Sequence, residues 1–89
     1  WTELARETYT GVLIFTAEFS ISAALDLEQA VELLLERLSK HPLSCPPSPS
    51  LPRFRRCIIT KNASLVYEIR DEEVRVIAVV DNRANTLYF

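Results

Sequence analysis

CIITKNASLVYEIRDEEVRVIAVVDNR, residues 57–83, is the stretch that decides the fold. With the residues just before it, it reads as three short strands, at 53–60, 63–69 and 73–80, joined by two polar turns. Because the connections are so short, the strands must be antiparallel neighbours. Residues 74–80 are apolar almost without interruption, so we expect the last strand to be the central one, covered on both faces.

The segment upstream of the strands predicts a loop preceded by a helix. Residues 41–52 contain all five prolines of the chain, which remove backbone donors and favour an extended connection. Residues 22–40 place leucine and valine at the spacing of one buried helical stripe. Cations occupy the last turn of that segment and Pro42 prevents its continuation, so a helix is predicted to end at about residue 40.

The first segment, residues 2–19, is ambiguous from its pattern. Thr2 can cap a helix, and Leu4, Thr8, Phe15 and Phe19 form a partial helical stripe. However, the segment is also rich in β-branched and aromatic residues, which favour strands, and it carries a glycine that would weaken a helix. The pattern alone leaves helix and strand open.

Composition and charge restrict the class of protein. The 89 residues predict one domain, with a net charge of −2 that does not favour general nucleic-acid binding. Residues 1–40 carry a net charge of −4 and residues 41–89 a net charge of +2. The basic side chains concentrate in a nine-residue stretch without acids, at Arg53, Arg55, Arg56 and Lys61. No apolar run approaches the roughly 18 residues that span a membrane, so a membrane role is not expected.

The cysteines and the single histidine give no sign of a metal site or cofactor. Cys45 and Cys57 are interpreted as two free thiols in a reducing cytoplasm, with a disulfide as the alternative. His41 has no His or Cys at metal-ligand spacing, so we expect neither a metal nor a cofactor. The sequence begins at Trp1 rather than methionine, and we expect the native chain to extend before it.

Four short motifs, in order along the chain, resemble the RelE/ParE toxin superfamily. Residues 64–69, SLVYEI, resemble its "(R/S)-hydrophobic-V/I-Y-x-(I/V)" strand, which a charged turn and an apolar strand follow. Residues 38–42, LSKHP, are similar to the "L-x-x-x-P" close of its second helix. Residues 1–5, WTELA, are similar to its "W-(S/T)-x-x-A" opening, and residues 81–83, DNR, to its "D-x-R" exit.

The resemblance implies an α+β fold and a biological role. The fold is β-α-α-β-β-β over a single domain, residues 1–89, with an antiparallel sheet packed on two helices and the first strand truncated or absent. Helices are then expected at about 2–19 and 22–40 and a three-stranded meander at 53–81. The role is that of a bacterial, cytoplasmic, plasmid-stabilising toxin of a type II toxin–antitoxin system, neutralised by a cognate antitoxin.

Three mechanisms remain open under this resemblance. RelE-like members cleave mRNA on the ribosome, whereas ParE-like members poison DNA gyrase. The third possibility is a catalytically inactive toxin-like module that only binds its antitoxin. Cleaving RNA without a metal requires positive charge to stabilise the transition state and groups that transfer protons.

The catalytic candidates under the ribonuclease hypothesis are Arg83, Lys61 and Tyr88. Arg83 matches a family position that holds a catalytic arginine, and Tyr88 lies near the C-terminal tyrosine of those enzymes. Ser64 stands where the ribonucleases usually carry an arginine, and a serine cannot supply that charge.

The other polar residues have both structural and functional interpretations. Arg53, Arg55 and Arg56 are interpreted as charges protecting an edge strand or as contacts to RNA or an acidic partner. Asp81 and Arg83 can pair locally and pin the strand end, or act in function. Tyr67 is expected in the core, with its hydroxyl reaching a polar partner.

Overall fold

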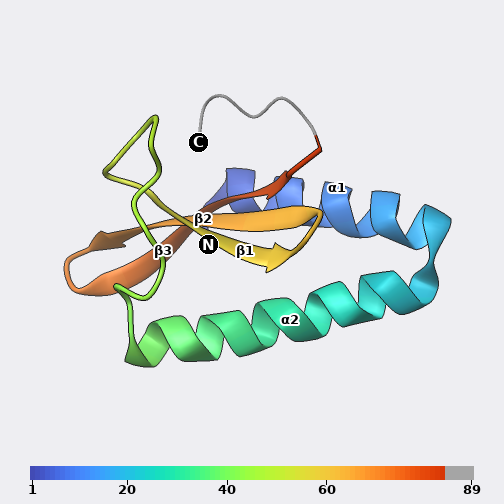
Figure 1. Cartoon of the computed structure of the whole chain (residues 1–89), viewed down its shortest axis with the longest axis horizontal. Helices are drawn as coiled ribbons and strands as arrows, with labels where there is room; N and C mark the ends of the chain where they lie inside the picture. Colours follow the sequence, from blue (N-terminus) through green and yellow to red (C-terminus); the bar gives the residue numbers. More distant parts are fainter. Residues whose placement is uncertain (84–89) are drawn as a thin grey trace.

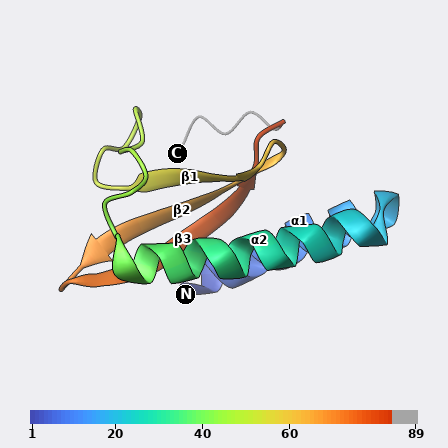
Figure 2. The same cartoon turned by 60° about the horizontal axis from the view of Figure 1, so that its bottom comes forward.

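The computed structural model describes residues 1–83. Two helices are followed by a three-stranded antiparallel sheet in the order β1-β2-β3. The helices form a hairpin on one face of the sheet, and the tip of the hairpin projects beyond it (Figures 1 and 2). This confirms the α+β fold expected for a RelE/ParE-like chain. The elements are α1 Glu3–Phe19, α2 Ile21–Lys40, β1 Arg55–Thr60, β2 Ala63–Arg70 and β3 Glu73–Asp81.

Residues 3–19, ambiguous by pattern, form helix α1. The hydroxyl of Thr2 accepts a hydrogen bond from the amide of Ala5 at 3.0 Å, which satisfies a free donor of the first turn. The same hydroxyl donates to the carbonyl of Ile77 in β3 at 3.0 Å. One side chain therefore starts the helix and fastens it to the sheet. Gly11 is exposed, and nothing lies within 4 Å of where its Cβ would be, so it fills no packing role.

Helix α2 confirms the predicted buried stripe. Leu27, Val31, Leu34 and Leu38 are all buried, at most 7% exposed. Ser20 joins the helices and caps α2, because its hydroxyl accepts from the amide of Ala23 at 3.1 Å. The tight joint holds α1 and α2 antiparallel and lets both present their apolar sides to the sheet.

The prediction that the last strand is central was wrong: β2 is the central strand and β3 pairs only with β2 among the described strands. Residues 63–67 of β2 are all buried. The outer edge of β3 is contacted by α1 instead of a strand. There the amide of Thr2 donates to the carbonyl of Val76 at 3.0 Å, and the amide of Val79 donates to the hydroxyl of Thr8 at 2.9 Å.

The long apolar run of β3 does not reflect a central position in the sheet. It reflects burial on both faces of the strand, which the sequence suggested. Val76 belongs to the core beneath the helices, together with Leu65 and Tyr67. On the opposite face, Ala78 and Val80 pack with Val66 and with Phe54 from the loop before β1.

The cysteines form a disulfide, so the interpretation as free thiols was wrong. Cys45 in the proline-rich loop is bonded to Cys57 in β1, with Cα atoms 5.4 Å apart. The proline-rich loop doubles back along β1, as a hydrogen bond from the backbone amide of Arg56 to the carbonyl of Pro46, 3.1 Å long, shows. Spacing in the sequence cannot reveal this return path. Within residues 1–83, neither helix is long and apolar enough to cross a membrane.

Candidate functional site

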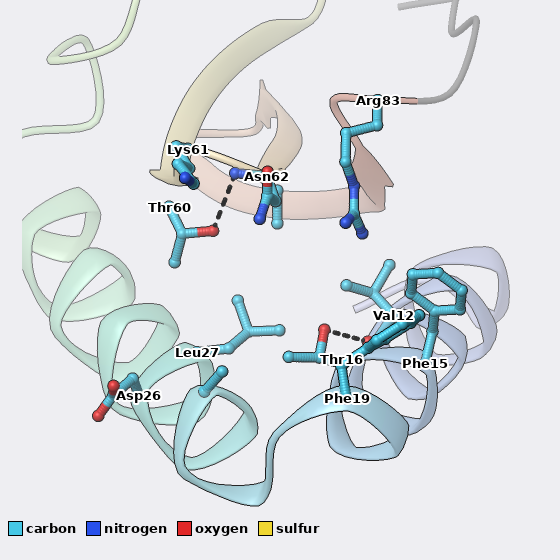
Figure 3. A pocket seen from close by; sticks show the side chains of 12 residues that line it. Val12, Phe15, Thr16, Phe19, Asp26, Leu27, Thr60, Lys61, Asn62 and Arg83 are labelled. Atoms are coloured by element: carbon cyan, nitrogen blue, oxygen red, sulfur yellow. Dashed lines mark hydrogen bonds between the residues drawn. The ribbon is translucent and has the colours of Figure 1, made fainter.

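A pocket of about 320 Å³ opens between the tip of the helix hairpin and the far end of the sheet. The β1–β2 turn and the residues after β3 form one side of the pocket. The C-terminal half of α1 and the N-terminal part of α2 form the other side (Figure 3). The site therefore joins three segments that are distant in sequence. Its lining residues are Val12, Phe15, Thr16, Phe19, Ala23, Asp26, Leu27, Thr60, Lys61, Asn62, Ala63 and Arg83.

The helical side of this pocket is mostly apolar, with Thr16 and Asp26 as its polar residues, and its aromatic side chains are exposed. Phe15 and Phe19 stack edge to face, with ring centroids 5.1 Å apart. Phe15 is 42% exposed and Phe19 is 77% exposed, although both are large apolar side chains. Exposed aromatic side chains grouped in a concave site are typical of surfaces that another molecule covers. We call this helical side, with Phe15 and Phe19, the floor of the pocket. It suits an apolar group of a partner.

The sheet side of the pocket brings two catalytic candidates together. Lys61 in the β1–β2 turn and Arg83 after β3 both line it. The guanidinium of Arg83 points towards α1 and lies over the ring of Phe15, 5.2 Å from its centroid (Figure 3). The pocket thus combines an apolar floor with a cationic rim.

Arg83 is already engaged by a neighbouring carboxylate. Its Nε and Nη2 each donate to Asp81 at 3.0 Å, and its backbone amide donates to Asp81 at 2.8 Å. These hydrogen bonds lower the pKa of the Asp81 carboxyl below its usual range and raise the pKa of Arg83. Asp81 therefore stays ionised at neutral pH and offsets much of the charge of Arg83. The predicted local pairing is present.

Ser64 is completely buried, so it does not face the pocket. Its hydroxyl donates to the side-chain oxygen of Asn82 at 2.7 Å, and Arg56 donates to the same oxygen at 2.8 Å. The backbone amide of Asn82 donates to the backbone carbonyl of Asn62 at 2.8 Å. Ser64 and Asn82 thus fix the β1–β2 turn against the exit of β3, which sets the positions of Lys61 and Arg83.

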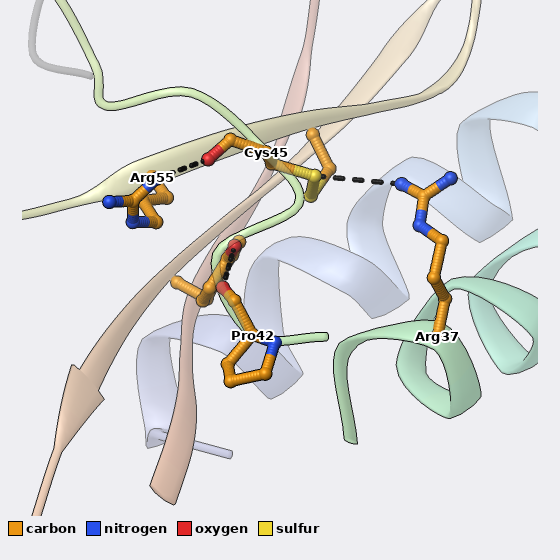
Figure 4. The surroundings of a disulfide bond; sticks show 6 residues. Arg37, Pro42, Cys45 and Arg55 are labelled. Atoms are coloured by element: carbon orange, nitrogen blue, oxygen red, sulfur yellow. Dashed lines mark hydrogen bonds between the residues drawn. A yellow bond between two sulfur atoms is a disulfide. The ribbon is translucent and has the colours of Figure 1, made fainter. Parts of the chain in front are cut away.

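The three predicted binding arginines do not gather around the pocket. Arg53 lies over the ring of Phe54, at 4.7 Å from its centroid. Arg55 donates to the carbonyl of Cys45 at 2.6 Å (Figure 4), and Arg56 reaches Asn82. Arg53 and Arg55 lie near the start of β1, whereas the pocket lies beyond its end. Tyr88, the third catalytic candidate, lies outside the described residues.

Tyr67 is a core residue, as predicted. It is fully buried, and its hydroxyl donates to the carbonyl of Pro42 at 2.5 Å. Burial raises the pKa of Tyr67, and the nearby cations Arg55 and Arg37 only partly oppose that effect. The hydroxyl therefore stays neutral at physiological pH and is not a proton acceptor.

The sequence did not point to the aromatic floor of the pocket. Phe15 and Phe19 were assigned to a partial helical stripe, which normally indicates burial. They are exposed because the hairpin projects past the end of the sheet (Figure 2). The pattern gave no signal for this exposure, because Phe19, fourteen residues after the buried Ala5, falls near the same side of α1 as Ala5.

Comparison with known families agrees with this architecture. Residues 1–86 match the family model described as "ParE toxin of type II toxin-antitoxin system, parDE". The fold and the match together define a toxin of the RelE/ParE superfamily. Since the matched region is nearly the whole chain, the protein belongs to the ParE toxin family, and this membership implies an antitoxin partner. No curated protein matches the chain.

Proposed function

We propose that this protein inhibits growth by binding DNA gyrase through the pocket at the hairpin tip, without cleaving RNA. The observation that carries the proposal concerns two positions: the catalytic candidate Arg83, and Ser64, which stands where the ribonucleases usually carry an arginine. Both side chains are held in structural contacts. Ser64 is buried against Asn82, and Arg83 is bound by Asp81. An apolar floor with exposed aromatic side chains suits a protein target better than a phosphodiester. We place this action in the cytoplasm.

A ribonuclease is the second candidate, because Lys61 and Arg83 line the same pocket. A phosphate between them could be stabilised by both charges if Asp81 were displaced from Arg83. A catalytically inactive module that only binds its antitoxin is the remaining alternative. It predicts neither an effect on gyrase nor an effect on mRNA.

Two parallel assays separate these mechanisms. Purified protein should inhibit supercoiling by gyrase in proportion to its concentration, while mRNA ends mapped in a translating extract stay unchanged. Arg83→Ala should leave mRNA ends unchanged as well. Codon-spaced cuts that disappear in Arg83→Ala, with supercoiling intact, would favour the ribonuclease instead. Neither effect at high concentration would favour the inactive module.

A further inference from the structure

A second hollow, here called the hairpin groove, lies between α1 and α2 near their junction and has a volume of about 350 Å³. It shares no lining residue with the pocket at the hairpin tip. Both helices contribute to it, and six of its seven lining residues are apolar, so it follows the seam between the helices. The lining residues are Leu13, Ile14, Ala17, Ile21, Ala24, Leu25 and Glu28.

The large apolar side chains of the hairpin groove are open to solvent. Ile14 is 58% exposed, Ile21 is 70% exposed and Leu25 is 60% exposed. A single exposed apolar residue is ordinary on a protein surface, but a contiguous group of them is typical of a surface that a partner covers. The hairpin groove is therefore a candidate interaction surface.

Carboxylates continue the hairpin groove along α2. Ile21 and Leu25 lie four residues apart, on one side of the helix. The same side continues with Glu28 and then with Glu32, three and four residues further on. Both glutamates lie near Tyr9 on α1: burial raises the pKa of Tyr9, and the charges of Glu28 and Glu32 raise it further. The hairpin groove thus runs from an apolar end at the helix junction to an acidic end beside Tyr9.

The acidic end is not neutralised within residues 1–83. There Glu28 and Glu32 are exposed, and neither has an ion-pair partner within 4.0 Å. The ion pair on the helices joins Lys40 to Glu36 instead, and Arg6, the basic residue of α1, pairs with neither glutamate. The negative charge of this end is therefore available to a partner.

We propose that the hairpin groove binds a cationic amphipathic helix of a protein partner. The apolar side chains of that helix would lie at the helix junction, and its lysine or arginine side chains at Glu28 and Glu32. A helix laid along the seam of two packed helices continues ordinary ridge-into-groove packing. Charge distinguishes this surface from the pocket at the hairpin tip, whose rim carries the cations Lys61 and Arg83. The inference does not rest on the proposed action on gyrase.

The same charges disfavour the two other occupants that suit an apolar groove. In a symmetric dimer, the carboxylates of each copy would face either the carboxylates or the apolar end of the other copy, and both arrangements are unfavourable. An anionic membrane surface would repel residues 1–40, which carry seven acidic and three basic side chains. A cationic amphipathic helix complements both ends of the groove at once.

Two synthetic peptides of about 18 residues, long enough to form a helix, test the proposal by fluorescence anisotropy. Both carry one stripe of leucines, flanked by lysines in one peptide and by glutamates in the other. The lysine peptide should bind the purified chain with a Kd in the micromolar range, about tenfold or more tighter than the glutamate peptide. Its affinity should fall several-fold when sodium chloride rises from about 0.05 M to about 0.3 M, because salt screens exposed charges.

The position of the bound lysine peptide is mapped by the amide NMR signals that shift on binding. We expect shifts at Ile21, Leu25 and Glu28, because these residues line the hairpin groove. The signals of Lys61 and Arg83, which line the other pocket, should stay in place.

A pair of charge variants tests the acidic end. Glu28→Gln with Glu32→Gln should weaken binding of the lysine peptide about fivefold, since two exposed charge pairs are lost. Glu72→Gln with Glu73→Gln is the matched control. It removes the same charge at the β2–β3 turn, at the opposite end of the molecule from the hairpin tip (Figure 1). The control should bind the peptide as well as the wild type.

A pair of apolar variants tests the other end. Ile21→Ala with Leu25→Ala should weaken binding about tenfold or more and leave the circular dichroism spectrum unchanged, because both side chains are largely exposed. Leu33→Ala is the control, since Leu33 is 67% exposed on the same helix but does not line the groove. Neither variant touches the pocket at the hairpin tip, so both should inhibit gyrase as the wild type does.

Four results would overturn the proposal. The first is equal affinity for the lysine and glutamate peptides, or no binding of either at about 1 mM. The second is a set of NMR shifts centred on Lys61 and Arg83. The third is an equal loss of affinity in the groove variants and their controls. The fourth is dimerisation, or binding to phosphatidylglycerol vesicles, that Ile21→Ala with Leu25→Ala removes. A failure of the wild type to inhibit gyrase would leave this proposal intact.

Discussion

Replacing Tyr67 by alanine is expected to lower the free energy of unfolding by about 3–5 kcal/mol, as for other large aromatic core residues. Tyr67 is fully buried in the centre of β2, within the core that joins both helices to the sheet. A domain of this size is stable by only about 5–10 kcal/mol, so the variant should be partly unfolded at 37 °C. Chemical denaturation followed by circular dichroism measures the change.

Tyr67→Phe is the matched control, because it keeps the ring and removes only the hydroxyl. Losing the hydrogen bond to Pro42 should cost about 1 kcal/mol. If Tyr67→Ala costs no more than Tyr67→Phe, the ring does not support the core and the description of the fold is wrong.

Comparing the wild type with Tyr67→Phe tests the raised pKa of Tyr67. Because the unfolded state ionises first, the stability that the neutral hydroxyl contributes is present below about pH 10 and is lost as pH rises through the folded-state pKa. The wild type should therefore lose stability above about pH 10 more steeply than Tyr67→Phe. Tyr9, whose pKa burial also raises, is present in both proteins and cancels in the comparison.

Removing the aromatic side chains of the pocket is expected to weaken inhibition strongly without unfolding the protein. Phe15→Ala combined with Phe19→Ala removes two stacked rings that are already substantially exposed, so stability should change little. Aromatic anchors at interface centres commonly contribute 2 kcal/mol or more, which corresponds to a loss of about thirtyfold in affinity. Gyrase supercoiling, titrated with wild type and variant, measures the loss.

Leu33→Ala is the control for this pocket variant. Leu33 is an apolar residue of α2 that is 67% exposed, and it does not line the pocket. It should inhibit as well as the wild type. Equal loss in Leu33→Ala and in the pocket variant would mean that general surface hydrophobicity, not the pocket, carries binding.

The parts of the fold with strong local signals were predictable. The α2 stripe, the two short turns and the stop at Pro42 depend on neighbouring residues, and each was placed within a few positions. The superfamily resemblance also depended on short motifs in order, and the ParE match confirms it. Local patterns decide which elements form, because capping, periodicity and turn chemistry act over a few residues.

The arrangement of those elements was not predictable from the same signals. An apolar strand is buried on both faces whether it is central, as β2 is, or lies at an edge that a helix covers, as β3 does. The Cys45–Cys57 bond depends on a loop that doubles back, and the spacing of the two cysteines does not encode that path.

The pocket was only half predictable. Lys61 and Arg83 were candidates because their charge suits phosphate chemistry, and they do line one site. The contribution of Phe15 and Phe19 depends on how far the hairpin projects beyond the sheet, which is a tertiary property. The contact that holds Ser64 was not predictable either, because it joins β2 to Asn82, eighteen residues further on, whereas the Arg83–Asp81 pair is local and the sequence indicated it.

Growth of bacteria that express this chain from an inducible promoter tests the central claim, that it is a toxin, most directly. The account predicts that induction stops growth and that co-expressing the cognate antitoxin restores it. Cells making the Phe15→Ala, Phe19→Ala variant at the same level should keep growing. Normal growth of cells that accumulate the folded wild-type protein without an antitoxin would contradict the account.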